Sequence, residues 1–360
     1  MKSLFHKLTL AVFASASLAG SFAVAQQQQA WFNGRTDALN NEWTGFFSPG
    51  VNGNWSPTLA LPGGSGRWPG QAAVGSVNNG SSTDIAFFGD GASNLTPTVG
   101  LNHTTTGGRL TLGGIGFRST NTTFSIGNSS KLGDVPGSNP PSPAVAGILQ
   151  LNGAAISTLT GQFDSSVSGG KLIVIGDGAT RDASIVESNN GGQAGQRLGL
   201  GTANGEFYVT GGRQLGIFVA VTDEGNGRGF TKTGAGTMVL SQNNTFSGAV
   251  TISGGTLQVG NGGTTGNFGT TTATVNNSGV LAVNRTNTFT IANVIAGTGT
   301  VSNLGSGTTI LTGNNSYGTT NISAGTIQVG NGSTSGTLGS GNVTNNGTLT
   351  FNRSDNVTVG

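Results

Sequence analysis

The stretch from Gly234 to Gly269 reads GAGTMVLSQNNTFSGAVTISGGTLQVGNGGTTGNFG, and it returns from Gly305 to Gly339 as GSGTTILTGNNSYGTTNISAGTIQVGNGSTSGTLG. A further match follows, since VNNSGVLAVNR, from Val275, corresponds to VTNNGTLTFNR, from Val343. The repeat period is therefore about 70 residues. One such unit cannot bury its own apolar face, so the repeat predicts a solenoid in which each unit stacks on the next.

Short apolar groups, separated by Gly and Asn turns, recur within one period. They are Val239, Val250 with Ile252, Leu257 with Val259, Leu281 with Val283, and Phe289 with Ile291. Each group predicts a strand with one face inward. Alternation places Leu257 and Val259 inside and Gln258 outside, and it does the same for Ile327, Val329 and Gln328 in the second copy. Strands at this spacing also suit a sandwich or barrel, but the repeat favours the solenoid.

The composition agrees with an all-β chain rich in turns. Of 360 residues, 66 are glycine, while only 15 are Lys or Arg and 13 are Asp or Glu. The sequence has no apolar run long enough for a transmembrane helix, so we expect no such helix in the mature chain. It has 0 cysteines, and stability without disulfides suits a long repetitive scaffold.

The first 25 residues predict a secretory signal peptide. Lys2, His6 and Lys7 precede an apolar segment over residues 8–20, and Ala23-Val24-Ala25 makes a small-x-small cleavage site. Removal of this segment takes away two lysines and leaves about as many basic as acidic side chains. A chain without a basic surplus lacks the electrostatic term for nucleic acid or anionic lipid. We therefore expect an exported protein that binds no nucleic acid.

Three regions follow the signal peptide. Residues 26–90 are rich in tryptophan, residues 91–229 predict irregular solenoid coils with a proline-rich loop near 134–147, and residues 230–360 hold the repeats, which stop in mid-repeat. The tryptophans are Trp31, Trp43, Trp55 and Trp68. We predict that they cap the first coil, whose open end must be covered. The alternative is that they stack on sugar rings, which makes these four residues the candidate ligand contacts.

The repeats resemble the autotransporter-associated β-strand repeat, found in passenger regions of large bacterial surface proteins. The motif at Gly234 and its second copy carry this resemblance, and Phe230-Thr231-Lys232-Thr233 is similar to the usual lead-in. The resemblance implies a right-handed parallel β-helix (β-solenoid) outside the cell of a Gram-negative-type bacterium. It brings no catalytic residues, and it implies a translocator or anchor beyond the end of this sequence.

The search for catalytic chemistry in the sequence is negative. Residues 225–354 contain no Asp or Glu, and the histidines are His6 and His103. Acid–base catalysis, nucleophile activation and most metal sites need carboxylate, imidazole or thiolate groups. We therefore expect no catalytic residues, no cofactor and no metal site.

Two acidic stretches before the repeats have a structural and a functional interpretation. Asp177 and Asp182 flank a loop that could bind calcium, but Asp-Gly is ordinary turn chemistry. Asp223, Glu224 and Arg228 could form a small polar site, but they are typical of a solvated turn. We predict a structural turn in both places. A groove that joined Asp84, Asp90, Asp177 and Asp182 would instead favour a carbohydrate-active enzyme.

The sequence predicts a non-enzymatic, exported surface protein with a β-helical stalk for adhesion, display or envelope structure. Its partners would be surface polysaccharide or a host or environmental surface. The alternative is a carbohydrate-binding or carbohydrate-active β-helix protein with its site in the amino-terminal region.

Overall fold

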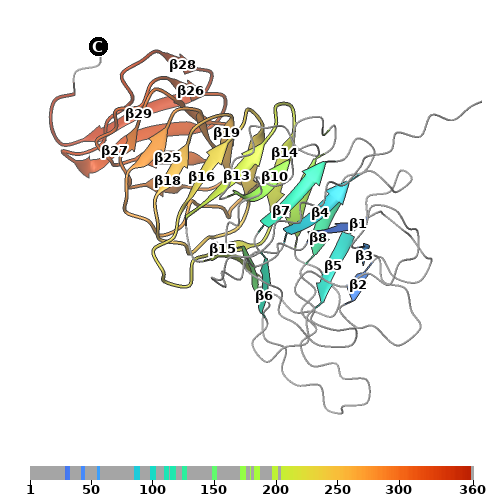
Figure 1. Ribbon diagram of the computed structural model, residues 1–360. Helices are drawn as coiled ribbons and strands as arrows, with labels where there is room; N and C mark the ends of the chain where they lie inside the picture. Colours follow the sequence, from blue (N-terminus) through green and yellow to red (C-terminus); the bar gives the residue numbers. More distant parts are fainter. Residues whose placement is uncertain are drawn as a thin grey trace, which may run out of the picture.

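The computed structural model describes residues 204–357 without a gap, residues 179, 182 and 201, and the strands nearer the amino terminus. In this part of the chain the strands form four sheets, and their successive coils stack into a parallel β-solenoid (Figure 1). The prediction of an all-β solenoid is confirmed. The signal peptide and the proline-rich loop lie outside the described residues.

Two long sheets run along the solenoid. Sheet A consists, in spatial order, of β3 (Trp55–Ser56), β1 (Gln29–Phe32), β4 (Ile85–Gly89), β7 (Gly114–Arg118), β10 (Lys171–Ile175), β13 (Gly205–Val209), β16 (Phe230–Thr233), β18 (Val250–Ile252), β20 (Val275–Asn277) and β23 (Ile295–Ala296). Sheet B consists of β2 (Glu42–Thr44), β5 (Thr98–Asn102), β8 (Phe124–Gly127), β11 (Ala183–Val186), β14 (Gln214–Ile217), β17 (Thr237–Leu240), β19 (Thr256–Gly263), β21 (Val280–Arg285), β24 (Thr300–Asn303), β26 (Thr320–Ile322) and β28 (Val343–Asn345).

Two shorter sheets form the third side of the coils. Sheet C belongs to the earlier coils and consists of β6 (Arg109–Leu112), β9 (Ile148–Leu151), β12 (Arg197–Leu200) and β15 (Ala220–Thr222). Sheet D belongs to the later coils and consists of β22 (Phe289–Ile291), β25 (Thr308–Leu311), β27 (Thr326–Ser333) and β29 (Thr348–Arg353). Among the described strands, the pair β1 and β3 is antiparallel and the other paired strands are parallel. Each coil therefore stacks in register on the one before it.

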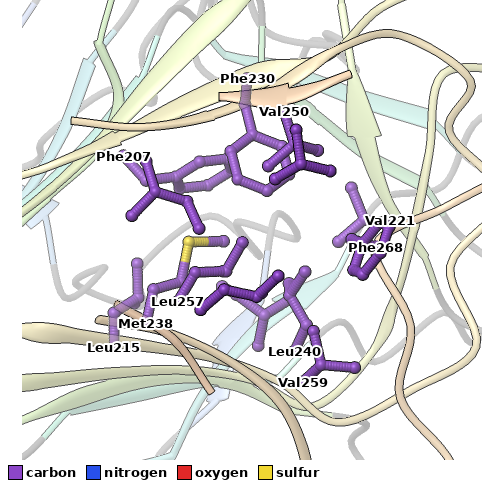
Figure 2. Close-up of a cluster of buried hydrophobic side chains, with 14 of the residues drawn as sticks. Phe207, Leu215, Val221, Phe230, Met238, Leu240, Val250, Leu257, Val259 and Phe268 are labelled. Atoms are coloured by element: carbon purple, nitrogen blue, oxygen red, sulfur yellow. The ribbon is translucent and has the colours of Figure 1, made fainter. Parts of the chain in front are cut away.

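The core is a continuous column of inward side chains. In sheet B, Leu257 lies between Met238 and Leu281 in the register, and all three are 0% exposed. Across the interior, the ring of Phe230 packs edge-on against those of Phe207 and Phe246, with centroids 5.1 and 5.3 Å away. Figure 2 shows Phe207 and Phe230 facing Met238 and Leu257 across the interior. Stacked coils thus bury the apolar faces that a single coil leaves open.

The predicted inside and outside positions of the T-[LI]-Q-V-G strand are confirmed. Leu257 and Val259 are 0% exposed, whereas Gln258 faces away and donates a side-chain hydrogen bond of 2.9 Å to the Gly260 carbonyl. The prediction for Val239 was wrong. Val239 is buried, but its register partner is the outward Gln258, and the inward residues of β17 are its neighbours Met238 and Leu240.

Glycine permits the tight corner before this strand in both copies. Gly255 and Gly325 have φ of 61° and 59°. A Cβ atom would lie 2.3 Å from the Gly236 carbonyl oxygen in the first corner and 2.3 Å from that of Gly307 in the second. A side chain at either corner would therefore collide with the coil below and strain the backbone.

The last coil is open on its far side. Val343 and Phe351 are 37% and 39% exposed, although their counterparts Val275 and Val283 in the first copy are buried. The difference follows from stacking. Val275 and Val283 lie in β20 and β21, which are covered by β23 and β24, whereas β28 and β29 have a described partner strand on one side only.

Candidate functional site

The tryptophan-bearing strands lie at the amino-terminal ends of the two long sheets. Trp31 is in β1 and Trp55 in β3, which are adjacent at the end of sheet A, and Phe32 is the register partner of Trp55. Trp43 is in β2, at the end of sheet B, and Trp68 lies outside the described residues. Strands at the ends of the sheets are where a cap would lie. The tryptophan side chains themselves lie outside the described part of the structure. Both the cap and the sugar-stacking role remain predictions.

The acidic residues are not gathered into a described catalytic or metal site. Asp84, Asp90, Asp177 and His103 lie outside the residues that the structure describes. Asp182 accepts a hydrogen bond of 2.8 Å from the Gln214 amide and lies 3.9 Å from the Arg213 guanidinium. Among the described residues, no group of three or more His, Cys, Asp or Glu side chains could hold a metal ion. Asp182 therefore joins two successive coils.

Asp223 is not the solvated residue that the sequence predicts. It is 1% exposed, and its carboxylate accepts hydrogen bonds from the Ser247 hydroxyl at 2.7 Å and the Ser247 amide at 3.1 Å. The amides of Gly225 and Arg228 donate at 3.0 and 2.9 Å. Burial raises the pKa of the Asp223 carboxyl, but the hydrogen bond from Ser247 and three backbone amides outweigh burial and hold the pKa below its usual range. Asp223 thus fastens its own turn to the next coil.

Lys232 is buried inside the solenoid, which the sequence analysis did not predict. Its side chain is 0% exposed, and its register neighbours on sheet A are Phe207 and Ile252. The ammonium group donates to three backbone carbonyls, those of Thr233, Gly234 and Gly254, at 2.7, 3.0 and 3.2 Å. These carbonyls match its three donors, yet burial still lowers the pKa of Lys232 to about 8. The amino group is committed to the corner and is not displayed to a ligand.

The second copy places an amide where the first has the ammonium. Asn303 aligns with Lys232 and is 1% exposed. Its Nδ2 donates to the carbonyls of Gly305 and Ala324 at 3.1 and 2.7 Å, and these residues align with Gly234 and Gly254. Its Oδ1 accepts a hydrogen bond of 2.7 Å from the Thr309 hydroxyl. Alternation could have shown that position 232 faces inward, because it is two residues from Phe230.

Comparison with protein families identifies the repeated unit. The passenger-associated-transport-repeat family matches residues 230–259 and 304–329. Part of each copy is therefore similar to the passenger-associated-transport repeat. The matched stretches run from the strand that carries Lys232, or from just after its counterpart, to Val259 in the first repeat and Val329 in the second. They therefore contain the corner and the inward strand described above.

A curated relative extends the similarity of the passenger-associated-transport repeats. The Adhesin BmaC autotransporter of Brucella suis biovar 1 (strain 1330) is 32% identical over 140 residues, which cover 35% of this chain and 4% of that protein. The chain thus spans a small part of the relative's length, and it is similar to an autotransporter passenger. No solved structure matches the chain significantly. Within the described residues, no helix has the length and apolar character needed to cross a membrane.

The buried Lys232 of the first passenger-associated-transport repeat should make stability depend on pH. In the unfolded chain this lysine keeps its proton up to about pH 10.5, whereas in the folded chain it loses the proton above about pH 8. Between these values the unfolded state binds more protons, so stability should rise with pH. We expect a gain of about 1–2 kcal/mol between about pH 8 and pH 9.5, measured by urea unfolding. The measurement stops at about pH 9.5 because burial raises the pKa of Tyr317 above its usual 10.0. At higher pH the titration of this tyrosine would add a pH dependence of its own.

The second repeat supplies the control for this pH measurement. Lys232→Asn alone leaves the buried amide oxygen without the hydroxyl donor that Thr309 provides, and it should cost about 1–3 kcal/mol. Adding Met238→Thr, at the position that aligns with Thr309, restores that donor, and the double variant should show no rise of stability above pH 8. A double variant with the same pH slope as the natural chain would refute the assignment of the slope to Lys232.

Proposed function

We propose that the chain is a non-enzymatic, exported surface protein whose β-solenoid forms an adhesin-like passenger or stalk. Its place would be the cell surface or the extracellular space of a Gram-negative-type bacterium. The similarity to an autotransporter adhesin and the two passenger-associated-transport repeats support this placement. A passenger of this kind works together with a translocator or anchor.

The non-enzymatic role is supported by the contacts of the three buried charged side chains among the described residues, Asp223, Lys232 and Arg285. Asp223 binds backbone amides and Ser247, and Lys232 binds three carbonyls. Arg285 donates to the carbonyls of Thr264 and Gly266, and its guanidinium lies 4.8 Å from the centre of the Phe289 ring. Each of these groups holds one coil to another segment of the chain. None of these three side chains is both exposed to solvent and next to a second acid, base or nucleophile, as a catalytic residue is.

The test combines exposure on cells with attachment. In the native bacterium, external protease should digest the protein on intact cells. Beads coated with the mature chain should attach in a flow cell to polysaccharide-coated or abiotic surfaces, while beads coated with a heat-unfolded sample should not. Incubation with the same polysaccharides should release no reducing ends. Protection from external protease together with failure of the beads to attach would contradict the proposal, and released sugar would contradict its non-enzymatic part.

A second candidate is carbohydrate binding by the amino-terminal tryptophans. Trp31 and Trp55 support it, because their strands β1 and β3 lie at the amino-terminal end of sheet A and an indole ring can stack on a sugar ring. Replacing both residues by Phe keeps an apolar ring in place. If the pair binds sugar, the double variant should lose polysaccharide binding while its unfolding midpoint stays within a few degrees. If the pair caps the solenoid, stability changes and binding does not.

A further inference from the structure

The two repeats have the same strands but use different sheets. Strands β16 to β21 of the first repeat alternate between sheets A and B, whereas their counterparts β24 to β29 alternate between sheets B and D. The strand with the T-[LI]-Q-V-G motif is β19 in sheet B in the first repeat and β27 in sheet D in the second (Figure 1). The second repeat is therefore advanced by one face of the solenoid.

The advance follows from the length of the coils. On sheet A, β16, β18, β20 and β23 begin at Phe230, Val250, Val275 and Ile295, so three full coils take about 65 residues. The repeat period is about 70 residues, and about five are left over. Those residues carry the first strand of the second repeat, β24, past sheet A and onto sheet B.

Each repeat ends this strand in an exposed segment with a rigid base. We call residues 261–264 and 331–334, which are exposed throughout, the tip segments. Behind the first, Arg285 donates to the Thr264 and Gly266 carbonyls, and behind the second, Arg353 donates to the Gly336 carbonyl.

The bases of the two tip segments also share an amide contact. The Gly266 amide donates to the Asn243 side chain at 3.3 Å, and the Gly336 amide donates to Asn314, the aligned residue, at the same distance. The two tips thus share an arginine-to-carbonyl contact and an amide-to-asparagine contact at their bases, while Arg285 also bonds Asn287 and Arg353 also pairs with Asp355. The tips project from different faces.

We infer that the two repeats of this chain present their tip segments on successive faces of the solenoid, so that the tips wind around the axis and contact an uncharged, hydrogen-bonding surface. With three faces, every third repeat returns to the same side. The tips read Asn-Gly-Gly-Thr and Asn-Gly-Ser-Thr and carry no ionisable side chain. Arg285, the nearest cation to the first tip, is 8% exposed and bound to backbone carbonyls.

The winding has a consequence for a stalk that is fixed at one end. A stripe of tips along one side would contact a target only when the stalk is turned toward it. Tips on successive faces meet the target over a wider range of rotations about the axis. The use for attachment rests on the proposed function, whereas the winding itself does not.

The winding is tested by a distance between the tips. Because the chain has 0 cysteines, Asn261→Cys and Asn331→Cys accept one spin label each. Tips stacked on one face would be three strand spacings apart, about 14 Å. On successive faces the separation should exceed about 20 Å, because it adds the width of the coil. Double electron–electron resonance and dipolar broadening cover both ranges.

A pair on one sheet provides the control distance. Gln258 and Asn321 are outward positions of sheet B, linked by the register through Ala282 and Ser302. Labels at Gln258→Cys and Asn321→Cys should therefore lie three strand spacings apart, about 14 Å. A tip pair no longer than this control overturns the winding.

The use of the tips is tested with beads that carry neutral dextran, carboxymethyl dextran or diethylaminoethyl dextran. The mature chain should attach to neutral dextran, and attachment should not weaken as salt rises. Replacing Asn and Thr of one tip by Ala should lower attachment by about half, and replacing those of both tips should abolish it. Thr298→Ala, at another exposed position, should leave attachment unchanged.

The outcomes separate the inference from the proposed function. Attachment that survives in the variant without either tip overturns the tips as the contact surface and leaves the adhesin role standing. Attachment to the charged dextrans alone overturns the uncharged partner. A natural chain that attaches to none of the surfaces contradicts the proposed function, while the distance measurement still decides the winding.

Discussion

Leu257→Ala should lower the free energy of unfolding of the coils around β19 by about 2–5 kcal/mol. Leu257 is 0% exposed and lies between Met238 and Leu281 in a stacked core, so truncation leaves a cavity that neighbouring coils cannot close. In a solenoid the loss should be felt mainly by adjacent coils. Hydrogen exchange should therefore quicken in β17, β19 and β21, while amides of β26 keep their protection. Urea unfolding of the full chain gives the overall size.

Gln258→Ala is the matched control for Leu257→Ala. Gln258 is the next residue on the same strand, but it faces outward and contributes one hydrogen bond, to the carbonyl of Gly260. Its loss should cost about 1 kcal/mol or less. If Gln258→Ala proved more damaging than Leu257→Ala, the inside and outside of the strand would be inverted, and with them the register of the whole repeat.

Asp223→Asn should cost about 2–4 kcal/mol near neutral pH, because a charged acceptor of four hydrogen bonds is replaced by an amide. The amide nitrogen of Asn is a donor, so it faces the donors of Ser247 and the Arg228 backbone amide without an acceptor. The change should loosen the turn at residues 223–228 from the coil that contains Ser247. Hydrogen exchange of the Gly225, Arg228 and Ser247 amides, together with the urea midpoint, measures the effect.

The same carboxylate predicts sensitivity to acid. Its pKa is lower in the folded chain than the ordinary 3.8, so the stabilisation is present above about pH 4 and is lost as pH falls through the folded value. The natural chain should therefore lose more stability between pH 5 and about pH 2 than Asp223→Asn does. If the two proteins lost equal stability in acid, ionisation of Asp223 would not stabilise the folded chain.

The positions that the sequence predicts correctly depend on neighbours along the chain. The order of Leu257, Gln258 and Val259 decides which of them faces inward, because side chains of a strand alternate. Val239 shows where this reasoning fails. It lies among three consecutive apolar residues of β17, and a run without alternation does not indicate which residue faces inward.

The two buried charges depend on contacts that a sequence pattern does not contain. Asp223 looks like an ordinary turn residue until Ser247, 24 residues later, brings a hydroxyl and an amide to it. Lys232 looks like a surface lysine until the corner of the next coil offers the Gly254 carbonyl. In both cases the partner comes from the neighbouring coil. The tryptophan cap stays a prediction, since Trp31, Trp43 and Trp55 are placed by their strands alone.

The sequence by itself determined the all-β class, the period of about 70 residues and the stacking of units, because alternation and repetition are local patterns and a lone unit cannot bury its apolar face. Only the tertiary structure decided on which sheet each copy lies. That placement depends on how many residues every coil uses, and the turns alone set this number. The successive strands of sheet A begin 20, 25 and 20 residues apart, from Phe230 to Ile295. Three coils therefore take about 65 residues, about five fewer than the repeat period, and this difference moves the second repeat to another face.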